Sequence, residues 1–154
     1  MPLRLVLAAF VISAACAPAN RGTDAALVEA TKREISQALD RYMTAARAVD
    51  AAGIAASFAP DGVLFEPGIA PVEGREAIRA FAASLPGVRV DTAIATPDVI
   101  EVFGETVLVW GSYFEKLAFP GQPVSEQRGR FVMEWKQQPD RTWLIQRYFR
   151  VPSS

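Results

Sequence analysis

A tyrosine and a glutamate, Tyr42 and Glu66, are the side chains of this sequence best suited to chemistry. The sequence has no histidine and one cysteine, so acid–base chemistry must come from carboxylates, phenols, lysines or arginines. Tyr42 lies on the apolar stripe of a predicted helix, where a buried hydroxyl needs a hydrogen-bond partner. Glu66 precedes Pro67, which favours an extended backbone, and its neighbours Leu64 and Phe65 are apolar. We therefore expect both polar groups at a semi-buried site.

Both residues also have a structural interpretation. Tyr42 can be a packed core residue, and Glu66 can be a rim carboxylate paired with an arginine. The arginines considered as its partner are Arg75, Arg128, Arg130 and Arg147. Arg147 alternates in register with Ile145 and Phe149, and an arginine on such an apolar face usually has an acidic partner or an anionic ligand. We therefore expect Arg147 in the ligand pocket, with Glu66 as its natural partner.

Aromatic side chains supply the predicted wall of this pocket. The candidates are Phe58, Phe81, Trp110 and Phe131. Trp110 and Phe131 occupy alternate positions of predicted strands, as do Trp135 and Trp143, which makes them core residues first and ligand wall second.

The composition excludes several classes of site. Without histidine, and with Cys16 alone, the chain cannot build a histidine-based triad, a zinc–thiolate cluster or an internal disulfide. No motif of clustered Asp and Glu favours a carboxylate metal site, so we expect neither metal nor cofactor. The formal net charge is −1 and no run of Lys or Arg forms a stripe, so nucleic acid is not an expected partner.

The first residues have the pattern of an export signal. A basic start at Arg4 is followed by the apolar run Leu5–Ile12 and by small residues before Cys16. We therefore predict a signal peptide over residues 1–15 and a tether over residues 16–23, which places the domain in the periplasm or cell envelope. The apolar run is too short to span a bilayer as a helix.

The end of this signal has two interpretations. Cys16 after Ala14 and Ala15 resembles a bacterial lipobox, in which the cysteine is acylated and anchors the protein to the membrane. Ser13 departs from the leucine usual three places before that cysteine. The alternative is ordinary cleavage after Ala19, which leaves no lipid.

Hydrophobic periodicity divides the remaining chain into a helical half and a strand half. Helical spacing predicts helices over 24–49, 50–58 and 74–85, with Asp50 as the cap of the second. A turn over 59–62 leads into a short strand over 63–66. Alternation then predicts strands over 88–102, 105–118, 124–137 and 142–151. Helices followed by consecutive strands indicate an α+β domain with an antiparallel sheet.

Several motifs carry a family resemblance over residues 24–151. They are Asp50-Ala51-Ala52-Gly53, the run from Ser57 to Gly62, Phe65-Glu66-Pro67, the run from Glu73 to Phe81, and the strand endings at Trp135 and Ile145. Together they resemble the nuclear transport factor 2-like superfamily, which includes SnoaL-like polyketide cyclases and ketosteroid isomerases. The resemblance implies a cone-shaped, curved antiparallel sheet wrapped around three N-terminal helices, with a pocket at its open end. This superfold hosts enzymes and non-enzymes alike.

The resemblance also suggests roles for the polar pair. In ketosteroid isomerases a tyrosine donates to the substrate oxyanion and an acid moves the proton, and these positions fall on Tyr42 and Glu66. Burial near apolar walls raises the pKa of a carboxyl toward the working pH, which suits a general base. The second oxyanion acid falls on Phe131, however, and the supporting hydroxyls fall on Phe58 and Ala82. With Glu66 in place of an aspartate, these departures argue against a steroid isomerase.

Three functions stay open at this level. The preferred one is an exported domain that binds a small apolar molecule in its pocket. The second is an isomerase or cyclase with Glu66 as general base and Tyr42 as oxyanion donor. The third is a structural or dimerisation domain whose cone is filled by phenylalanines, namely Phe58, Phe81 and Phe131.

The resemblance further implies a homodimer, because family members commonly pair through the outer face of the sheet. Both faces of the strand over 105–118 are apolar, so the face turned away from the helices also needs a cover.

Overall fold

The computed structural model describes residues 21–85 and 87–153 of the 154-residue chain. The predicted signal peptide over residues 1–15 and the predicted acylation site Cys16 lie outside the described residues. Within the described part, the helices are too short or too polar to qualify as membrane-spanning segments.

The three helices precede the long strands, and their bounds are α1 Arg21–Arg47, α2 Ala51–Ala56 and α3 Arg75–Ala83. The apolar stripe of α1 is buried at Ile35, Leu39 and Tyr42. Because α1 begins at Arg21, it includes the last residues of the tether predicted over 16–23. The Asp50 carboxylate accepts a hydrogen bond from the amide of Ala52 at 3.1 Å and so caps α2, as predicted.

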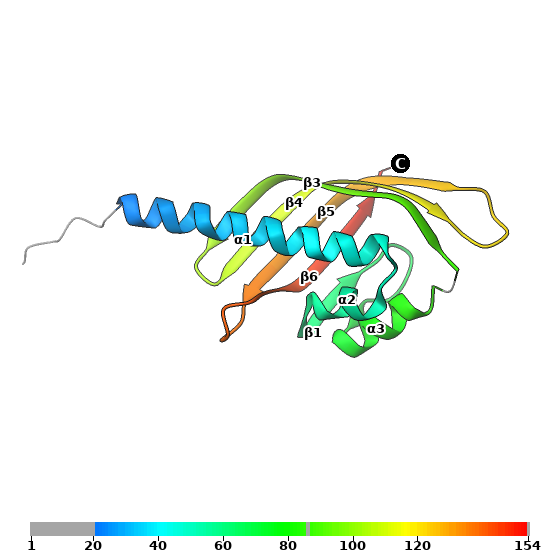
Figure 1. Cartoon of the computed structure of the whole chain (residues 1–154), viewed down its shortest axis with the longest axis horizontal. Helices are drawn as coiled ribbons and strands as arrows, with labels where there is room; N and C mark the ends of the chain where they lie inside the picture. Colours follow the sequence, from blue (N-terminus) through cyan, green and yellow to red (C-terminus); the bar gives the residue numbers. More distant parts are fainter. Residues whose placement is uncertain (1–20, 86, 154) are drawn as a thin grey trace, which may run out of the picture.

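Six strands form one sheet in the order β2-β1-β6-β5-β4-β3. Their bounds are β1 Phe58–Phe65, β2 Val72–Glu73, β3 Arg89–Phe103, β4 Thr106–Ala118, β5 Ser125–Gln137 and β6 Trp143–Pro152. Figure 1 shows α1 lying along the sheet, with α2 and α3 together near the C-terminal end of α1. Helices packed against a curved sheet confirm the predicted α+β class.

The first strand corrects two predictions. Residues 59–62 were expected to form a turn, but they belong to β1, where the register with β6 shifts between Phe58 and Val63. This irregularity absorbs the Pro and Gly residues that resemble a turn in the sequence. In addition, β1 pairs with β6 in parallel, whereas the other four pairings are antiparallel, as expected.

The curvature of the sheet has a local cause at Gly111. A side chain added to Gly111 would place its Cβ 2.0 Å from the carbonyl oxygen of Thr96, so only glycine allows this approach of β4 to β3. The register of β3 shifts between Pro97 and Val99, directly opposite. Such combinations of bulge and glycine bend a sheet and produce a concave face.

The two faces of the sheet have different roles. The concave face carries the core, with Val107, Val109, Phe131, Met133, Trp135 and Ile145 buried beneath α1. The opposite face carries an apolar row in which each residue is the register partner of the next on the neighbouring strand. We call this the outer row, and it consists of Val99, Trp110, Val132, Phe149 and Phe65.

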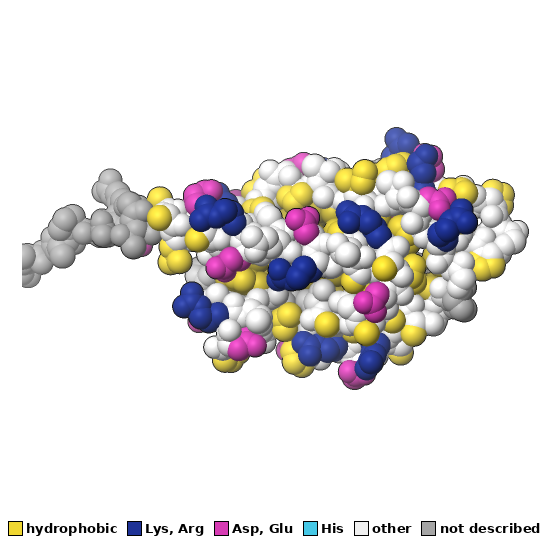
Figure 2. Space-filling view, viewed as in Figure 1, with side chains coloured by type: hydrophobic (Ala, Val, Ile, Leu, Met, Phe, Trp, Pro, Cys, Tyr) yellow, Lys and Arg dark blue, Asp and Glu magenta, His cyan; other side chains and the backbone are white. Residues whose placement is uncertain are grey.

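The surface charge is mixed. Figure 2 shows Lys and Arg side chains interspersed with Asp and Glu over the face that it presents, with apolar side chains scattered between them. Several of these charges pair locally, such as Lys32 with Glu29 on α1 and Lys116 with Glu126 between β4 and β5.

Candidate functional site

An apolar cavity lies between the three helices and the concave face of the sheet, and its volume is about 150 Å³. Its walls come from α1, α2, α3, β1, β3, β4 and β6 and from the segments that directly follow α1, β1, α3 and β4. The apolar lining residues are Ala46, Val49, Ile54, Leu64, Ile78, Phe81, Ala82, Leu85, Val88, Val90, Leu117 and Phe119. Four further lining residues are polar, and they are Tyr42, Glu66, Glu115 and Arg150.

Three of these polar residues form a buried ion-pair cluster, which we call the polar floor. Arg150 donates from Nη1 to Oε1 of Glu66 at 3.2 Å and from Nη2 to Oε2 of Glu115 at 2.5 Å. The side chains of Arg150, Glu66 and Glu115 are only 13%, 19% and 15% exposed. One guanidinium thus bridges the carboxylate of Glu66, directly after β1, and that of Glu115 on β4, and the formal charge of the cluster is −1.

The guanidinium is held from a further side by an aromatic ring. The Cζ atom of Arg150 lies 4.3 Å from the ring centroid of Tyr113, within the range of a cation–π contact. Its Nε–H is buried and has no acceptor among the described residues. Although burial alone would lower the pKa of Arg150, the surrounding Tyr148, Glu66 and Glu115 raise it, so the guanidinium stays charged.

Burial also changes the proton affinity of Glu66. Removal from water raises the pKa of the Glu66 carboxyl, Arg150 opposes this increase through its charge and hydrogen bond, and the negative charge of Glu115 adds to it. The net direction is upward. A carboxyl in this position exchanges its proton nearer to neutral pH than an exposed glutamate does.

Two tyrosines lie beside the polar floor. The rings of Tyr42 and Tyr148 meet edge to face with centroids 5.7 Å apart, and both residues are buried. Burial raises the pKa of both phenols. The hydroxyl of Tyr42 therefore keeps its proton at neutral pH and is available as a hydrogen-bond donor.

The structure brings together part of the predicted site. Tyr42, Glu66 and Phe81 line the same cavity. Phe58 and Phe131 are fully buried behind it, where their rings lie 6.1 Å from Tyr42 and 6.4 Å from Tyr148 respectively, both edge to face. They support the tyrosines and do not line the cavity.

Two further predicted pocket residues lie on the other side of the sheet or at the surface. Trp110 is in the outer row, because the odd-numbered neighbours Val107 and Val109 take the concave face of β4. Arg147 pairs with Glu134 at 2.5 Å and its side chain is 49% exposed. Neither of them is among the residues that line the cavity.

The misplacement of Arg147 has a specific cause. The register between β5 and β6 shifts, so that Trp135 faces Ile145 while Glu134 faces Arg147. This extra residue reverses the alternation, and after it Tyr148 and Arg150 point inward. Strict alternation from Ile145 would have placed Arg147 inside.

None of the four arginines considered as partners of Glu66 fills that role. Arg128 pairs with Glu126, and Arg130 pairs with Asp98. Arg75 donates from Nε and Nη2 to the carbonyl oxygen of Phe58, at 2.9 and 2.6 Å. It therefore ties the start of α3 to β1.

Sequence reasoning missed Arg150 and Glu115. Glu115 could have been found, because it alternates in phase with Val107, Val109 and Tyr113 on the concave face. The inward position of Arg150 depends on the bulge in β6, and no glycine or proline marks the bulge between Ile145 and Arg147.

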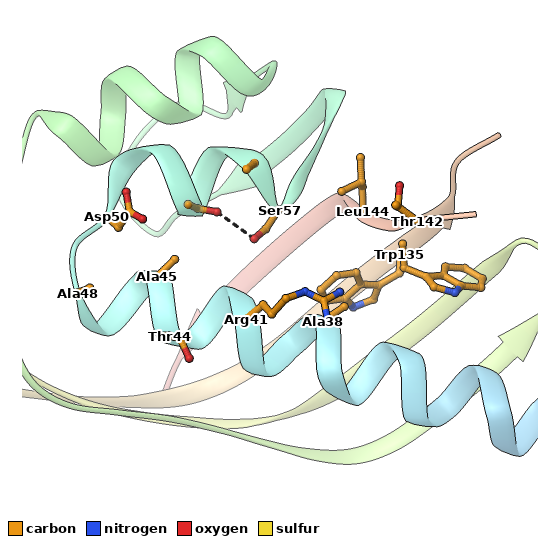
Figure 3. Close-up of a pocket in the computed structure, with 13 residues that line it drawn as sticks. Ala38, Arg41, Thr44, Ala45, Ala48, Asp50, Ser57, Trp135, Thr142 and Leu144 are labelled. Atoms are coloured by element: carbon orange, nitrogen blue, oxygen red, sulfur yellow. Dashed lines mark hydrogen bonds between the residues drawn. The ribbon is translucent and has the colours of Figure 1, made fainter. Parts of the chain in front are cut away.

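A second hollow opens beside α1 and α2 and is drawn in Figure 3, with a volume of about 480 Å³. Its wall consists mainly of small residues of the two helices, opposite Trp135, Trp143 and Leu144. Its charged residues, Arg41 and Asp50, are exposed, and its one drawn hydrogen bond runs from the hydroxyl of Ser57 to a backbone oxygen. Because no buried ionisable groups converge on it, we place the candidate site at the smaller cavity.

The described residues contain no recognisable metal centre. In residues 21–85 and 87–153, groups of three or more Asp, Glu or Cys side chains arranged to hold a metal ion do not occur. In the polar floor the guanidinium already occupies the space between the two carboxylates.

Solved structures place this architecture in a known fold. A ketosteroid isomerase-like protein from Erwinia carotovora atroseptica is similar with a TM-score of 0.70 at 18% identity, over 78% of this chain and 94% of that one. A conserved protein from Planctomyces limnophilus is similar with a TM-score of 0.73 at 22% identity, over 81% of this chain and 99% of that one. A nuclear transport factor 2-like protein from Salmonella enterica is similar with a TM-score of 0.70 at 18% identity, over 82% of this chain and 93% of that one. The fold is therefore the nuclear transport factor 2-like cone.

The family follows from the sequence profile. The chain belongs to the SnoaL-like domain family, whose profile matches residues 29–148. No curated protein matches the chain. The predicted superfamily and fold are thereby confirmed.

Proposed function

We propose that the domain binds a small apolar molecule in the cavity beneath α1. The observation that carries this proposal is a cavity whose walls are mainly apolar and which the polar floor and Tyr42 also line. Ligand sites typically combine such walls with a few polar groups that orient the ligand. A cone filled by phenylalanines is not favoured, because space remains in front of Phe58 and Phe131.

A thermal-shift screen of the purified domain tests this proposal. At a ligand concentration about tenfold above Kd, binding to the folded state stabilises it by about 1.4 kcal/mol, or about 5 °C for a domain of this size. We expect single-ring and short-chain apolar compounds to give such shifts. A broad panel without any shift would contradict the proposal.

A cavity-filling variant locates the binding. Ala46 lines the cavity and is half-buried, so Ala46→Phe is expected to occupy the space and abolish the ligand-induced shift. Ala26 on the same helix is exposed, and Ala26→Phe serves as the matched control with an unchanged shift. Equal shifts in both variants would place the ligand outside this cavity.

A second candidate function is proton transfer next to a carbonyl, as in an isomerase or cyclase. The raised pKa of Glu66 and the protonated phenol of Tyr42 at one cavity favour it, as base and oxyanion donor respectively. Glu66→Gln removes the base and keeps the shape, so it should abolish any turnover. Retained turnover would exclude Glu66 as the base.

A further inference from the structure

The size of the cavity limits the ligand to about one ring. An engineered protein cavity of about 150 Å³ lined by leucine, isoleucine and phenylalanine holds a single benzene molecule. The cavity here has the same volume and a similar lining, which includes Leu64, Ile78 and Phe81. A molecule with four fused rings exceeds this space. The volume thus argues against a steroid independently of the missing oxyanion acid.

The charge of the polar floor determines which charge the polar group of the ligand can carry. Glu66 and Glu115 contribute two negative charges and Arg150 one positive charge, and no other lining residue is charged. All three side chains are less than a fifth exposed. A net negative charge in an apolar surrounding is costly unless a cation or a proton compensates it.

The carboxylates also have unused hydrogen-bonding capacity. Arg150 binds Oε1 of Glu66 and Oε2 of Glu115. Within the part of the chain that the structure describes, the other oxygen of each carboxylate accepts no hydrogen bond. The rings of Tyr42, Phe81 and Phe119 also line the cavity, and aromatic faces attract cations.

These observations lead us to propose that the cavity selects a single-ring or short-chain primary amine, with its ammonium group at Glu66 and Glu115. This inference rests on the proposed binding function and specifies its ligand class. An ammonium group restores electrical neutrality and donates to the free carboxylate oxygens, while the ring or chain fills the apolar part. A carboxylate ligand of the same size would add a second net negative charge.

Four ligands with the same ring test this selectivity by calorimetry and thermal shift at pH 7, namely benzylamine, benzyl alcohol, toluene and benzoate. Because a hydrogen bond to a charged group contributes more than a neutral one, we expect benzylamine to bind about tenfold more tightly than benzyl alcohol. Toluene should bind like the alcohol or more weakly, and benzoate should bind weakest. Equal binding of amine and alcohol, or strongest binding of benzoate, would overturn the inference.

Charge removal provides the matched variants. Glu66→Gln makes the polar floor formally neutral. It should weaken the binding of benzylamine about tenfold while changing the affinity for toluene less than twofold. Glu101 is exposed on β3 and does not line the cavity, so Glu101→Gln should leave the affinity for both ligands unchanged. If Glu66→Gln fails to fold, Glu115→Gln gives the same test. Unchanged benzylamine affinity in a folded floor variant contradicts the inference.

The two proposals fail in distinguishable ways. If toluene stabilises the protein and benzylamine binds no more tightly, the amine inference is wrong and the binding function stands. If none of the four ligands binds, the proposed function fails together with it.

Discussion

Two arginines on β6 allow a direct comparison of a buried and an exposed ion pair. Arg150 and Arg147 each hold a glutamate oxygen at 2.5 Å, but their side chains are 13% and 49% exposed. Arg150→Met leaves Glu66 and Glu115 without their counter-charge in an apolar surrounding. Breaking a buried pair in this way costs about 3–5 kcal/mol. Arg147→Met removes an exposed pair, for which the expected cost is about 0–1 kcal/mol.

These free energies convert to measurable temperature shifts. For about 130 residues the entropy of unfolding is about 0.27 kcal/mol/K, so Arg150→Met should lower Tm by about 11–18 °C. Arg147→Met should lower it by less than about 4 °C. Urea denaturation followed by circular dichroism, with calorimetry for Tm, measures both variants under the same conditions.

The pH dependence distinguishes lost charge compensation from lost packing. Arg150 lowers the folded-state pKa of Glu66, so without the guanidinium this pKa rises further, and an acid with a raised folded pKa favours the folded state at low pH. The loss of stability in Arg150→Met, relative to the wild type, should therefore decrease as the pH falls toward 4 and increase as the pH rises toward 7. A loss below 1 kcal/mol, a loss equal to that of Arg147→Met, or a deficit independent of pH would refute this reasoning.

Three further predictions concern the polar floor, the outer row and the N-terminus. Because the pKa of Glu66 is higher in the folded state than its usual value of 4.5, this carboxyl stabilises the folded state at pH values below 4.5. The stabilisation is lost as the pH rises through the folded-state pKa. The variant Glu66→Gln should therefore be more stable than the wild type at pH 7 but not at pH 4. We propose that a second copy of the chain covers the outer row. Trp110 is the largest side chain of this row, so Trp110→Glu should convert a dimer into a monomer in sedimentation equilibrium while the wild type stays dimeric. We also propose acylation of Cys16, so Cys16→Ser in the full-length precursor should move the protein from the detergent phase to the aqueous phase, whereas unchanged partitioning would exclude a lipid anchor at this residue.

Much of the fold was predictable because its signals are local. The helical stripe of α1, the cap at Asp50 and the alternation in β3–β6 lie within single elements, and their predicted bounds agree with the structure to within about three residues. The short strand β2 and the parallel pairing of β1 with β6 were not predictable. The pairing of β1 with β6 depends on a partner that is distant along the chain, and β2 has only two residues, too few to show an alternating pattern.

The sequence by itself determined the fold class, the absence of histidine chemistry, and Tyr42 and Glu66 as residues facing a common site. The tertiary structure alone decided the counter-ion of Glu66. Arg150 and Arg147 are three residues apart in one strand, and a single extra residue in the β5–β6 register exchanges which of them faces inward. Because a register shift comes from pairing between strands, alternation within one strand cannot reveal it. The resulting cluster of one arginine and two glutamates determines the charge of the cavity.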